Sequence, residues 1–175
     1  MIYPNAKPNL AHHYFSELET SGKNIVIITQ NIDGLHQMAG SKEVLELHGS
    51  VHRVYCSKCY KKYDESVVNE SHGVPKCACG GVIRPDVVLY EEPLDDSLMS
   101  RAINYIRNAD VLIIGGTSLN VYPAAGLTRC VAPGTPIYLI DPNPVTWNSN
   151  EKVHHIVKGA SEGMKELFSI LNISL

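Results

Sequence analysis

The sequence predicts an α/β fold in which helices cover both faces of a parallel sheet. Continuous apolar runs alternate with segments of helical spacing along most of the 175 residues, a pattern typical of buried parallel strands. A cysteine-rich block, residues 51–83, interrupts this alternation. We therefore expect one domain of ordinary size, formed by residues 1–50 and 84–175, with the block as a small insertion.

The expected elements begin with a helix at residues 10–18, which Pro8 opens and Ser21-Gly22 ends, and a buried strand at residues 24–29. After the insertion, Asp95 and Asp96 are expected to cap the next helix. The later elements are a strand at 111–114, a helix opened by Pro123, a strand at 136–140 and a helix at 161–171. Because such sheets bind ligands at the carboxyl ends of their strands, the residues that follow each run are the candidate site.

Composition narrows the class of function. The chain is 44% hydrophobic, 19% charged and carries a formal net charge of -3, so it lacks the basic surface expected of a nucleic-acid-binding protein. It has no apolar stretch of about 20 residues that could span a membrane, and its first residues lack the order of a signal peptide. We therefore expect a cytoplasmic protein that binds no membrane and no specific nucleic acid.

The four cysteines of the insertion form two close pairs, Cys56 with Cys59 and Cys77 with Cys79, with 17 residues between the pairs. This spacing predicts a tetrahedral zinc site, and four thiolates leave no open position, so the metal is expected to be structural. Disulfides are the alternative, which a cytoplasmic location disfavours. The fifth cysteine, Cys130, is predicted to be a core residue.

Two polar stretches follow expected strands. Residues 29–36 read TQNIDGLH directly after the first strand, and Gly115-Gly116-Thr117-Ser118 follow the second. Glycines let the backbone approach a ligand, and Asp141, which ends the next strand, can bind ribose hydroxyls. Each stretch can equally be a turn, since Asn, Asp and Gly are turn formers.

In this order, the motifs together resemble the sirtuin family of NAD-dependent protein deacylases, from about residue 5 to the C-terminus. The resemblance is carried by residues 29–36, Leu47-His48-Gly49, the two cysteine pairs, Arg84-Pro85-Asp86-Val87-Val88, Gly116-Thr117-Ser118-Leu119 and Pro123-Ala124-Ala125. It implies a Rossmann-type domain with a zinc-ribbon insertion, and a cleft between them where NAD meets an acyl-lysine protein or peptide.

The resemblance also implies roles for individual residues. In sirtuins the acyl oxygen of the lysine attacks the anomeric carbon, nicotinamide leaves, and a histidine then deprotonates a ribose hydroxyl. His48 matches this base, and an imidazole suits the task because its pKa lies near working pH. Without the motif, His48 would be interpreted as a satisfied histidine at a turn.

Further implied contacts involve the cofactor and the substrate. Gln30 and Asn31 would bind a ribose and Asp33 the nicotinamide carboxamide, whereas His36 would only pack. The full set implied to contact NAD is Gln30, Asn31, Ile32, Asp33, Gly116, Thr117, Ser118, Asp141, Pro142, Asn143 and Ala160. The set implied to contact the substrate is Val88, Tyr90, Asn120 and Val121.

The chain departs from the family pattern in three respects. Glu91 stands where the family usually has a glycine, beside the segment expected to pair with the substrate, and Asp141 replaces an asparagine. The resemblance also starts after the family's glycine-rich phosphate-binding loop, so we expect the 175-residue chain alone to bind NAD poorly. A deacylase, a silent zinc-containing protein-binding module and a zinc-ribbon nucleic-acid binder remain as hypotheses, and the acidic balance disfavours the last.

Overall fold

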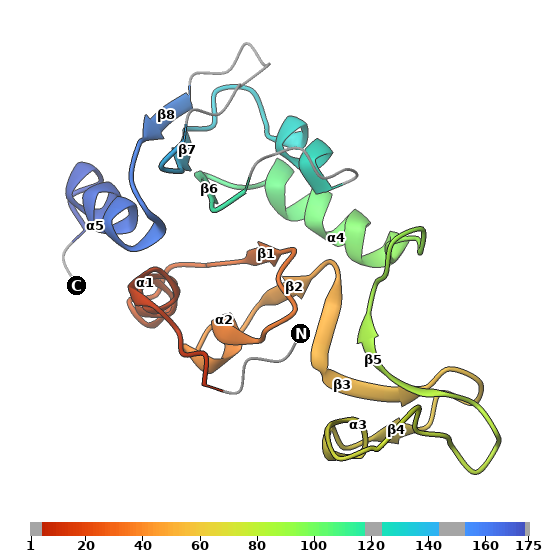
Figure 1. Cartoon of the computed structure of the whole chain (residues 1–175). Coiled ribbons are helices and arrows are strands. Elements are labelled where there is room, and N and C mark those ends of the chain that lie inside the picture. The colour runs from red at the N-terminus through yellow and green to blue at the C-terminus, as the bar shows by residue number, and fades with distance from the viewer. Residues whose placement is uncertain (1–4, 118–123, 144–152, 174–175) are drawn as a thin grey trace.

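A computed structural model describes residues 5–117, 124–143 and 153–173 (Figure 1). Its elements, in chain order, are α1 (Leu10–Thr20), β1 (Ile27–Thr29), α2 (Leu35–Met38), β2 (Val44–Glu46), β3 (Gly49–Cys56), β4 (Lys62–Tyr63), α3 (Ser66–Asn69), β5 (Ile83–Val87), α4 (Asp96–Arg107), β6 (Leu112–Gly115), the 3-10 helix η1 (Ala124–Cys130), β7 (Ile137–Ile140), β8 (Val153–Ile156) and α5 (Ala160–Ile170).

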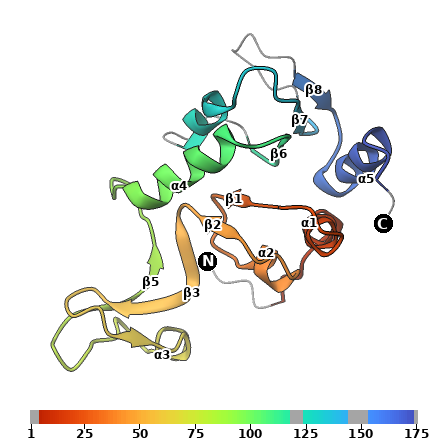
Figure 2. The ribbon, with the colours of Figure 1, turned by 180° about the vertical axis from the view of Figure 1, so that it is seen from behind.

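The parallel strands lie in two hydrogen-bonded groups. β1 pairs with β2 in parallel, and β7 pairs in parallel with β6 on one side and β8 on the other. In Figures 1 and 2, α1 and α5 lie on one side of these strands, and α4 with the segment of η1 lies on the opposite side. The predicted α/β fold class with parallel strands is confirmed.

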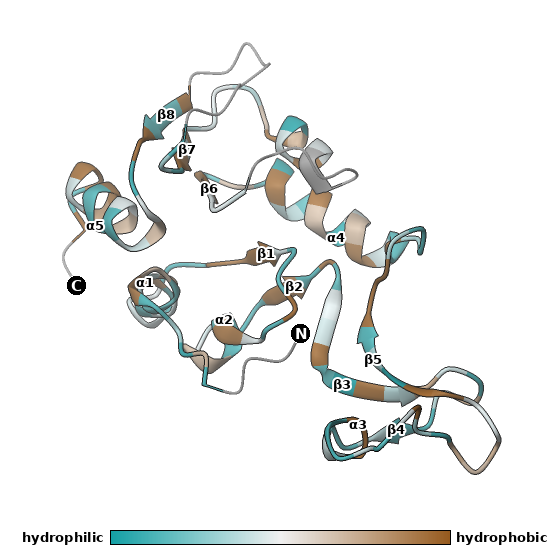
Figure 3. Ribbon diagram, in the orientation of Figure 1, coloured by the Kyte–Doolittle hydropathy of each residue, from teal (hydrophilic) through white to brown (hydrophobic). Residues whose placement is uncertain are grey.

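Two apolar clusters hold the helices against the strands. Leu18 of α1 and Phe168 of α5 pack with Ile140 of β7, and the rings of Tyr14 and Phe168 lie 4.6 Å apart between centroids. A second cluster joins α4 and η1 to the buried β2 region and contains Leu45, Leu47, Ala102, Ile106 and Leu127. Figure 3 shows the corresponding hydrophobic segments on the strands and on one face of the long helices.

The helix ends follow from local chemistry. The side chain of Asp95 accepts hydrogen bonds from the backbone N–H groups of Ser97 and Leu98, as its predicted capping role requires. Asn9 caps α1 in a reciprocal arrangement with His12. No helix in residues 5–117, 124–143 and 153–173 is long and apolar enough to cross a membrane.

Several elements differ from the expectations, among them the parallel strand β2, which was not predicted. The strand expected from residue 24 begins at Ile27, and the helix expected after Pro123 is the 3-10 helix η1, with Pro123 itself outside the described residues. Strand β8, which reads Val-His-His-Ile, was not predicted. Its two histidines conceal the apolar pattern, and only pairing with the buried β7 identifies it as a strand.

The cysteine-rich block forms most of an antiparallel sheet in the order β4-β3-β5. Figures 1 and 2 show this sheet and α3 extending away from the parallel strands. Its small core contains Val54, Cys56, Cys77 and Ile83, with Val67 and Val68 of α3 packed against it.

Candidate functional site

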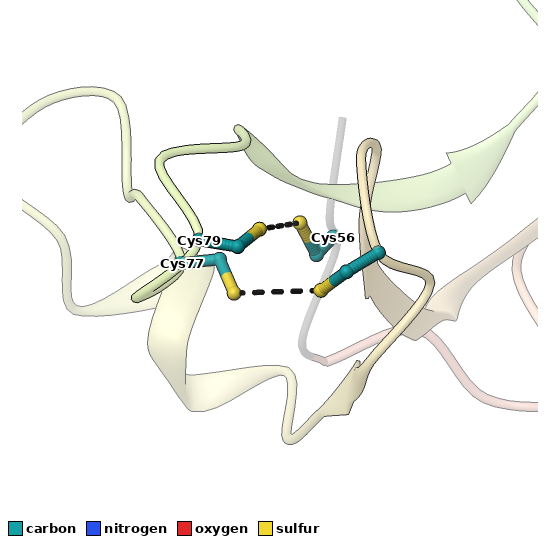
Figure 4. A group of neighbouring side chains, drawn as sticks. Cys56, Cys77 and Cys79 are labelled. Atoms are coloured by element: carbon teal, nitrogen blue, oxygen red, sulfur yellow. Dashed lines mark hydrogen bonds between the residues drawn. The ribbon is translucent and has the colours of Figure 1, made fainter.

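The four cysteines predicted to bind zinc converge at one point. Their sulfur atoms all lie within 4.8 Å of one another, and no other group of metal-ligating side chains was found in the described part of the chain. The Sγ atoms of Cys56 and Cys79 are 3.5 Å apart, and those of Cys59 and Cys77 are 3.7 Å apart (Figure 4). Tetrahedral zinc with bonds of about 2.3 Å places its sulfurs about 3.8 Å apart. The geometry therefore fits zinc, and all four thiols are free of disulfides.

Hydrogen bonds around the cluster lower the pKa of Cys56 and Cys77, whereas the neighbouring sulfurs raise that of Cys79. The N–H of Cys79 and the hydroxyl of Tyr63, 3.0 Å from the sulfur, lower the pKa of Cys77 to about 6. Gly81, the second of the two glycines that follow Cys79, is required for close packing at the cluster. A Cβ on Gly81 would lie 2.6 Å from the sulfur of Cys56. Such neighbours orient the ligands and tune their basicity.

His48 lies in the turn between β2 and β3, half-buried, with its Nδ1 atom 3.1 Å from the carbonyl oxygen of Gln30. A carbonyl oxygen only accepts, so Nδ1 carries the proton and Nε2 keeps a basic lone pair in the neutral ring. The backbone positions the histidine as well, since Leu47 donates to Thr29 and Val88 donates to His48, at 2.9 and 3.0 Å. The structure thus joins the TQNIDGLH and Leu47-His48-Gly49 motifs.

The loop after β1 contains residues that stabilise the turn and residues that are exposed to solvent. The carboxylate of Asp33 accepts from the N–H of Leu35 at 3.0 Å and so closes a turn before α2, whose N-cap residue is Gly34. Asn31 is exposed, and its N–H donates to the hydroxyl of Thr29 at 3.0 Å. The interpretation of this stretch as a turn is therefore correct for Asp33, whose carboxylate stabilises the turn. His36 is largely buried, and burial lowers its pKa to about 4. This agrees with its predicted packing role.

The second group lies at the ends of β6 and β7. Gly115 pairs with Ile140, and the N–H of Gly116, at a left-handed φ of 62°, donates to Ile140 at 3.3 Å. The buried Asp141 follows, and its carboxylate accepts from the N–H of Asn143 at 2.8 Å. Ser118, Asn120 and Val121 lie outside the described residues.

The remaining predicted residues are on the surface or at helix ends. Ala160 is the first residue of α5, beside Gly159, and Thr117, Pro142 and Ile32 occupy the loops described above. Val88 is half-buried, whereas Tyr90 is fully exposed. Cys130, predicted to be in the core, is half-buried at the edge of the cluster around Leu127.

An unpredicted ion pair braces the segment expected to bind substrate. Arg84 binds Glu92 through two nitrogens at 2.8 and 3.1 Å, and it also donates to the carbonyl of Val87. Glu92 in turn accepts from the N–H of Leu89, and Arg84 and this bond lower the pKa of Glu92 to about 2. In the sequence the pair appears only as two opposite charges eight residues apart. Such a spacing is common, so it does not identify an ion pair.

Glu91 occupies this same turn with a left-handed backbone, at φ 72°. This left-handed conformation costs a residue with a Cβ about 1–2 kcal/mol of folding free energy, whereas it costs glycine little. We expect Glu91→Gly to raise the free energy of unfolding by about 0.5–1 kcal/mol, once the greater entropy of unfolded glycine is subtracted. Urea unfolding measures the change.

Glu91→Ala is the matched control, because it removes the carboxylate and retains the left-handed strain. Equal stabilisation by the two variants would assign the effect to charge and contradict the backbone explanation.

The Sir2 family profile matches residues 1–123. A protein of Clostridium perfringens named NAD-dependent protein deacetylase is 61% identical over 142 residues, which is 81% of this chain and 58% of that protein. A protein of the same name from Cutibacterium acnes is 54% identical over 129 residues, covering 74% of this chain and 53% of the relative. The chain thus spans about half the length of these relatives.

Solved structures agree. A Sir2 protein bound to a propionylated peptide superposes with a TM-score of 0.86 and 38% identity, over 97% of this chain and 73% of that one. A Sir2 complex with a p53 peptide and NAD+ gives a TM-score of 0.84 and 38% identity, over 97% of this chain and 72% of that one. With the family profile covering well over half of its residues, the chain belongs to the Sir2 family.

Proposed function

We propose that the protein containing this chain is an NAD-dependent lysine deacylase, which transfers the acyl group to ADP-ribose and releases nicotinamide. The observation that carries this proposal is the hydrogen bond from His48 to Gln30. It directs the proton to Nδ1 and leaves Nε2 as a base beside the loop proposed to hold NAD. The names of the relatives and the acylated peptides in the solved structures support the same reaction.

The other residues act by binding and orientation. Gln30, Asn31 and Asp33 would address the nicotinamide ribose and carboxamide, and a similar solved structure contains NAD+. Gly116 and Asp141, at the ends of adjacent strands, would hold the adenosine half. Val88 and Tyr90 would contact the substrate peptide, with Val88 linked to His48 through the backbone. The acyl-lysine would thereby reach the base.

Zinc would be held by Cys56, Cys59, Cys77 and Cys79 and would supply folding energy to residues 51–83, which we propose as a zinc-ribbon unit inserted in the Rossmann-type domain. Among these four sulfurs no position is left for a water or substrate, so the metal takes no part in the reaction. Five free thiols fit a reducing compartment, and we place the protein in the cytoplasm.

His48→Ala tests the assignment. Removal of a positioned general base is expected to lower deacylation of an acetyl-lysine peptide by about 100- to 10,000-fold. The fold should change little because the half-buried ring makes one hydrogen bond. Mass spectrometry of the deacylated peptide and of released nicotinamide measures the loss.

His72→Ala provides the control, since His72 is exposed and lies in the small insertion. It should retain wild-type turnover. Turnover near the wild-type value in His48→Ala would contradict the proposed base. A wild-type protein that releases no nicotinamide would instead favour a silent zinc-containing protein-binding module.

A further inference from the structure

The pairing of β3 with β5 contains a bulge between Ser50 and Val54. Ser50 pairs with Asp86 and Val54 with the adjacent Pro85, so residues 51–53 of β3 have no partner in the ladder. Pro85 has no N–H to offer there. The N–H of His52 is instead close to the hydroxyl of Ser50, at 3.2 Å. The bulge therefore releases His52 from the sheet pattern and lets it reach other elements.

His52 contacts two segments that are distant in sequence. Its Nδ1 lies 2.7 Å from a carboxylate oxygen of Glu65, the residue that precedes α3. Its Nε2 lies 3.1 Å from the carbonyl oxygen of Asp33, in the loop of residues 30–34 that we call the Asp33 loop. The N–H of Val51 also donates to this loop, at Ile32, over 3.0 Å. The bulge thus contacts two consecutive residues of the loop.

Both atoms that face the imidazole are acceptors. A neutral ring has one N–H and satisfies one of them, whereas an imidazolium has two and satisfies both. The raised pKa of His52 agrees, with the hydrogen bond to Glu65 as its main cause. The charged groups around the ring are the carboxylate of Glu65 and the more distant Glu46 of β2, and both favour the cation.

The next residue of the loop fits this ring. Gly34 has a left-handed φ of 70°, and a Cβ on it would lie 3.0 Å from Cδ2 of His52. The glycine of TQNIDGLH therefore gives space to the imidazole as well as freedom to the backbone. On the other side, Val67 and Val68 of α3 pack against the apolar cluster that contains Cys56 and Cys77. A chain of contacts thus runs from the cysteine cluster through Glu65 and His52 to Asp33.

We propose that His52 is a positioning residue which, as an imidazolium, ties α3 and the metal-binding lobe to the Asp33 loop. The contact itself follows from the described geometry. Its consequence, that the lobe helps to hold the nicotinamide-binding loop, rests on the proposed function. His52 touches neither cofactor nor substrate in this account.

The proposal has a defined dependence on pH. The folded state raises the pKa of His52 above 6.5, so the cation and its two bonds are complete below pH 6.5. They are lost as the pH rises through the folded-state pKa. At alkaline pH one ring nitrogen has no proton to donate, so one of the two bonds that join Glu65 to the Asp33 loop through His52 is lost.

Glu65→Gln tests the proposal without loss of side-chain size, and Glu70→Gln, an equal charge change at the exposed end of α3, is the control. Nuclear magnetic resonance titration gives the pKa of His52 and the amide shifts of residues 33–35. Wild type and Glu70→Gln should show a pKa above 6.5 and amides that titrate with it. In Glu65→Gln the pKa should fall towards 6.5.

Hydrogen exchange provides the second measurement, with rates corrected for the intrinsic effect of pH. Near pH 6, His52→Gln should lower protection of the Asp33 loop by about two- to fivefold, since a half-exposed ion pair is worth less than about 1 kcal/mol. At alkaline pH the difference from wild type should shrink.

These outcomes separate positioning from simple packing. A His52 pKa at or below 6.5 in wild type, or amides of residues 33–35 that ignore its titration, would overturn the proposal. A loss of protection in His52→Gln that is equal at all pH values would also overturn it, as packing alone would explain that result. None of these measurements requires deacylase activity, so they fail or succeed independently of the proposed function.

Discussion

Cys59→Ala is expected to abolish zinc binding and to unfold the metal-binding lobe. Cys59 is exposed, so loss of its side chain removes little packing, and the effect reports on the metal. Structural zinc contributes about 10–16 kcal/mol in small zinc-finger peptides, and a core of four buried residues with two valines against it cannot replace that energy. Metal analysis should find one zinc per wild-type chain and none in the variant.

Hydrogen exchange locates the residues that unfold when zinc binding is lost. Exchange should become fast over residues 54–83, while the cluster of Leu18, Ile140 and Phe168 stays protected because it belongs to a separate core. Cys130→Ala is the matched control, since Cys130 lies outside the cysteine cluster and should leave zinc content unchanged. Zinc-free wild-type protein with a protected lobe would contradict the assignment.

Gly49→Ala is expected to cost at least about 3 kcal/mol of unfolding free energy, measured by urea denaturation. Gly49 has a left-handed φ of 80°, and a Cβ there would lie 1.9 Å from the carbonyl oxygen of Asp86. That oxygen belongs to the backbone of β5 and cannot move as a side chain does. The strands would have to separate beside His48, so deacylation in the full-length protein should be lost as well.

Gly22→Ala separates the two causes of this effect. Gly22 also has a left-handed φ, of 90°, but a Cβ there would meet nothing within 4 Å. It should cost only the conformational penalty of about 1–2 kcal/mol. Equal losses in the two variants would show that the close approach of β3 and β5 does not govern the stability of this turn.

Local patterns predicted the long helices and three of the parallel strands, β1, β6 and β7. Helix α4 begins at its Asp95 cap, α1 ends beside Ser21-Gly22, and the apolar runs became β6 and β7. The ends of β1 and the form of η1 could not be predicted, because backbone pairing and packing decide them. Strand β8 was missed because its polar residues are acceptable beside a buried strand.

The candidate site was predictable to a different extent. The cysteine cluster could be predicted from the sequence, because the spacing of the two cysteine pairs largely determines that their sulfurs can meet at one point. Gln30, Asp33 and His48 were found by resemblance, and their roles towards NAD stay predictions. The ion pairs that stabilise the strands around these residues were not predicted. Glu46, buried at the end of β2, binds Arg53, which also binds Asp86 at 2.9 Å, and these charges have no recognisable spacing.

The family motifs, the two cysteine pairs and the alternation of strands and helices are visible in the amino-acid sequence, since all of these depend on residues close along the chain. The hydrogen bond from His48 to Gln30 and the contacts of His52 with Glu65 and Asp33 arise only in the folded chain. Those contacts depend on the β2–β3 turn and on a bulge in β3. They form because strand pairing brings distant segments to within hydrogen-bonding distance, which no short pattern of residue types encodes.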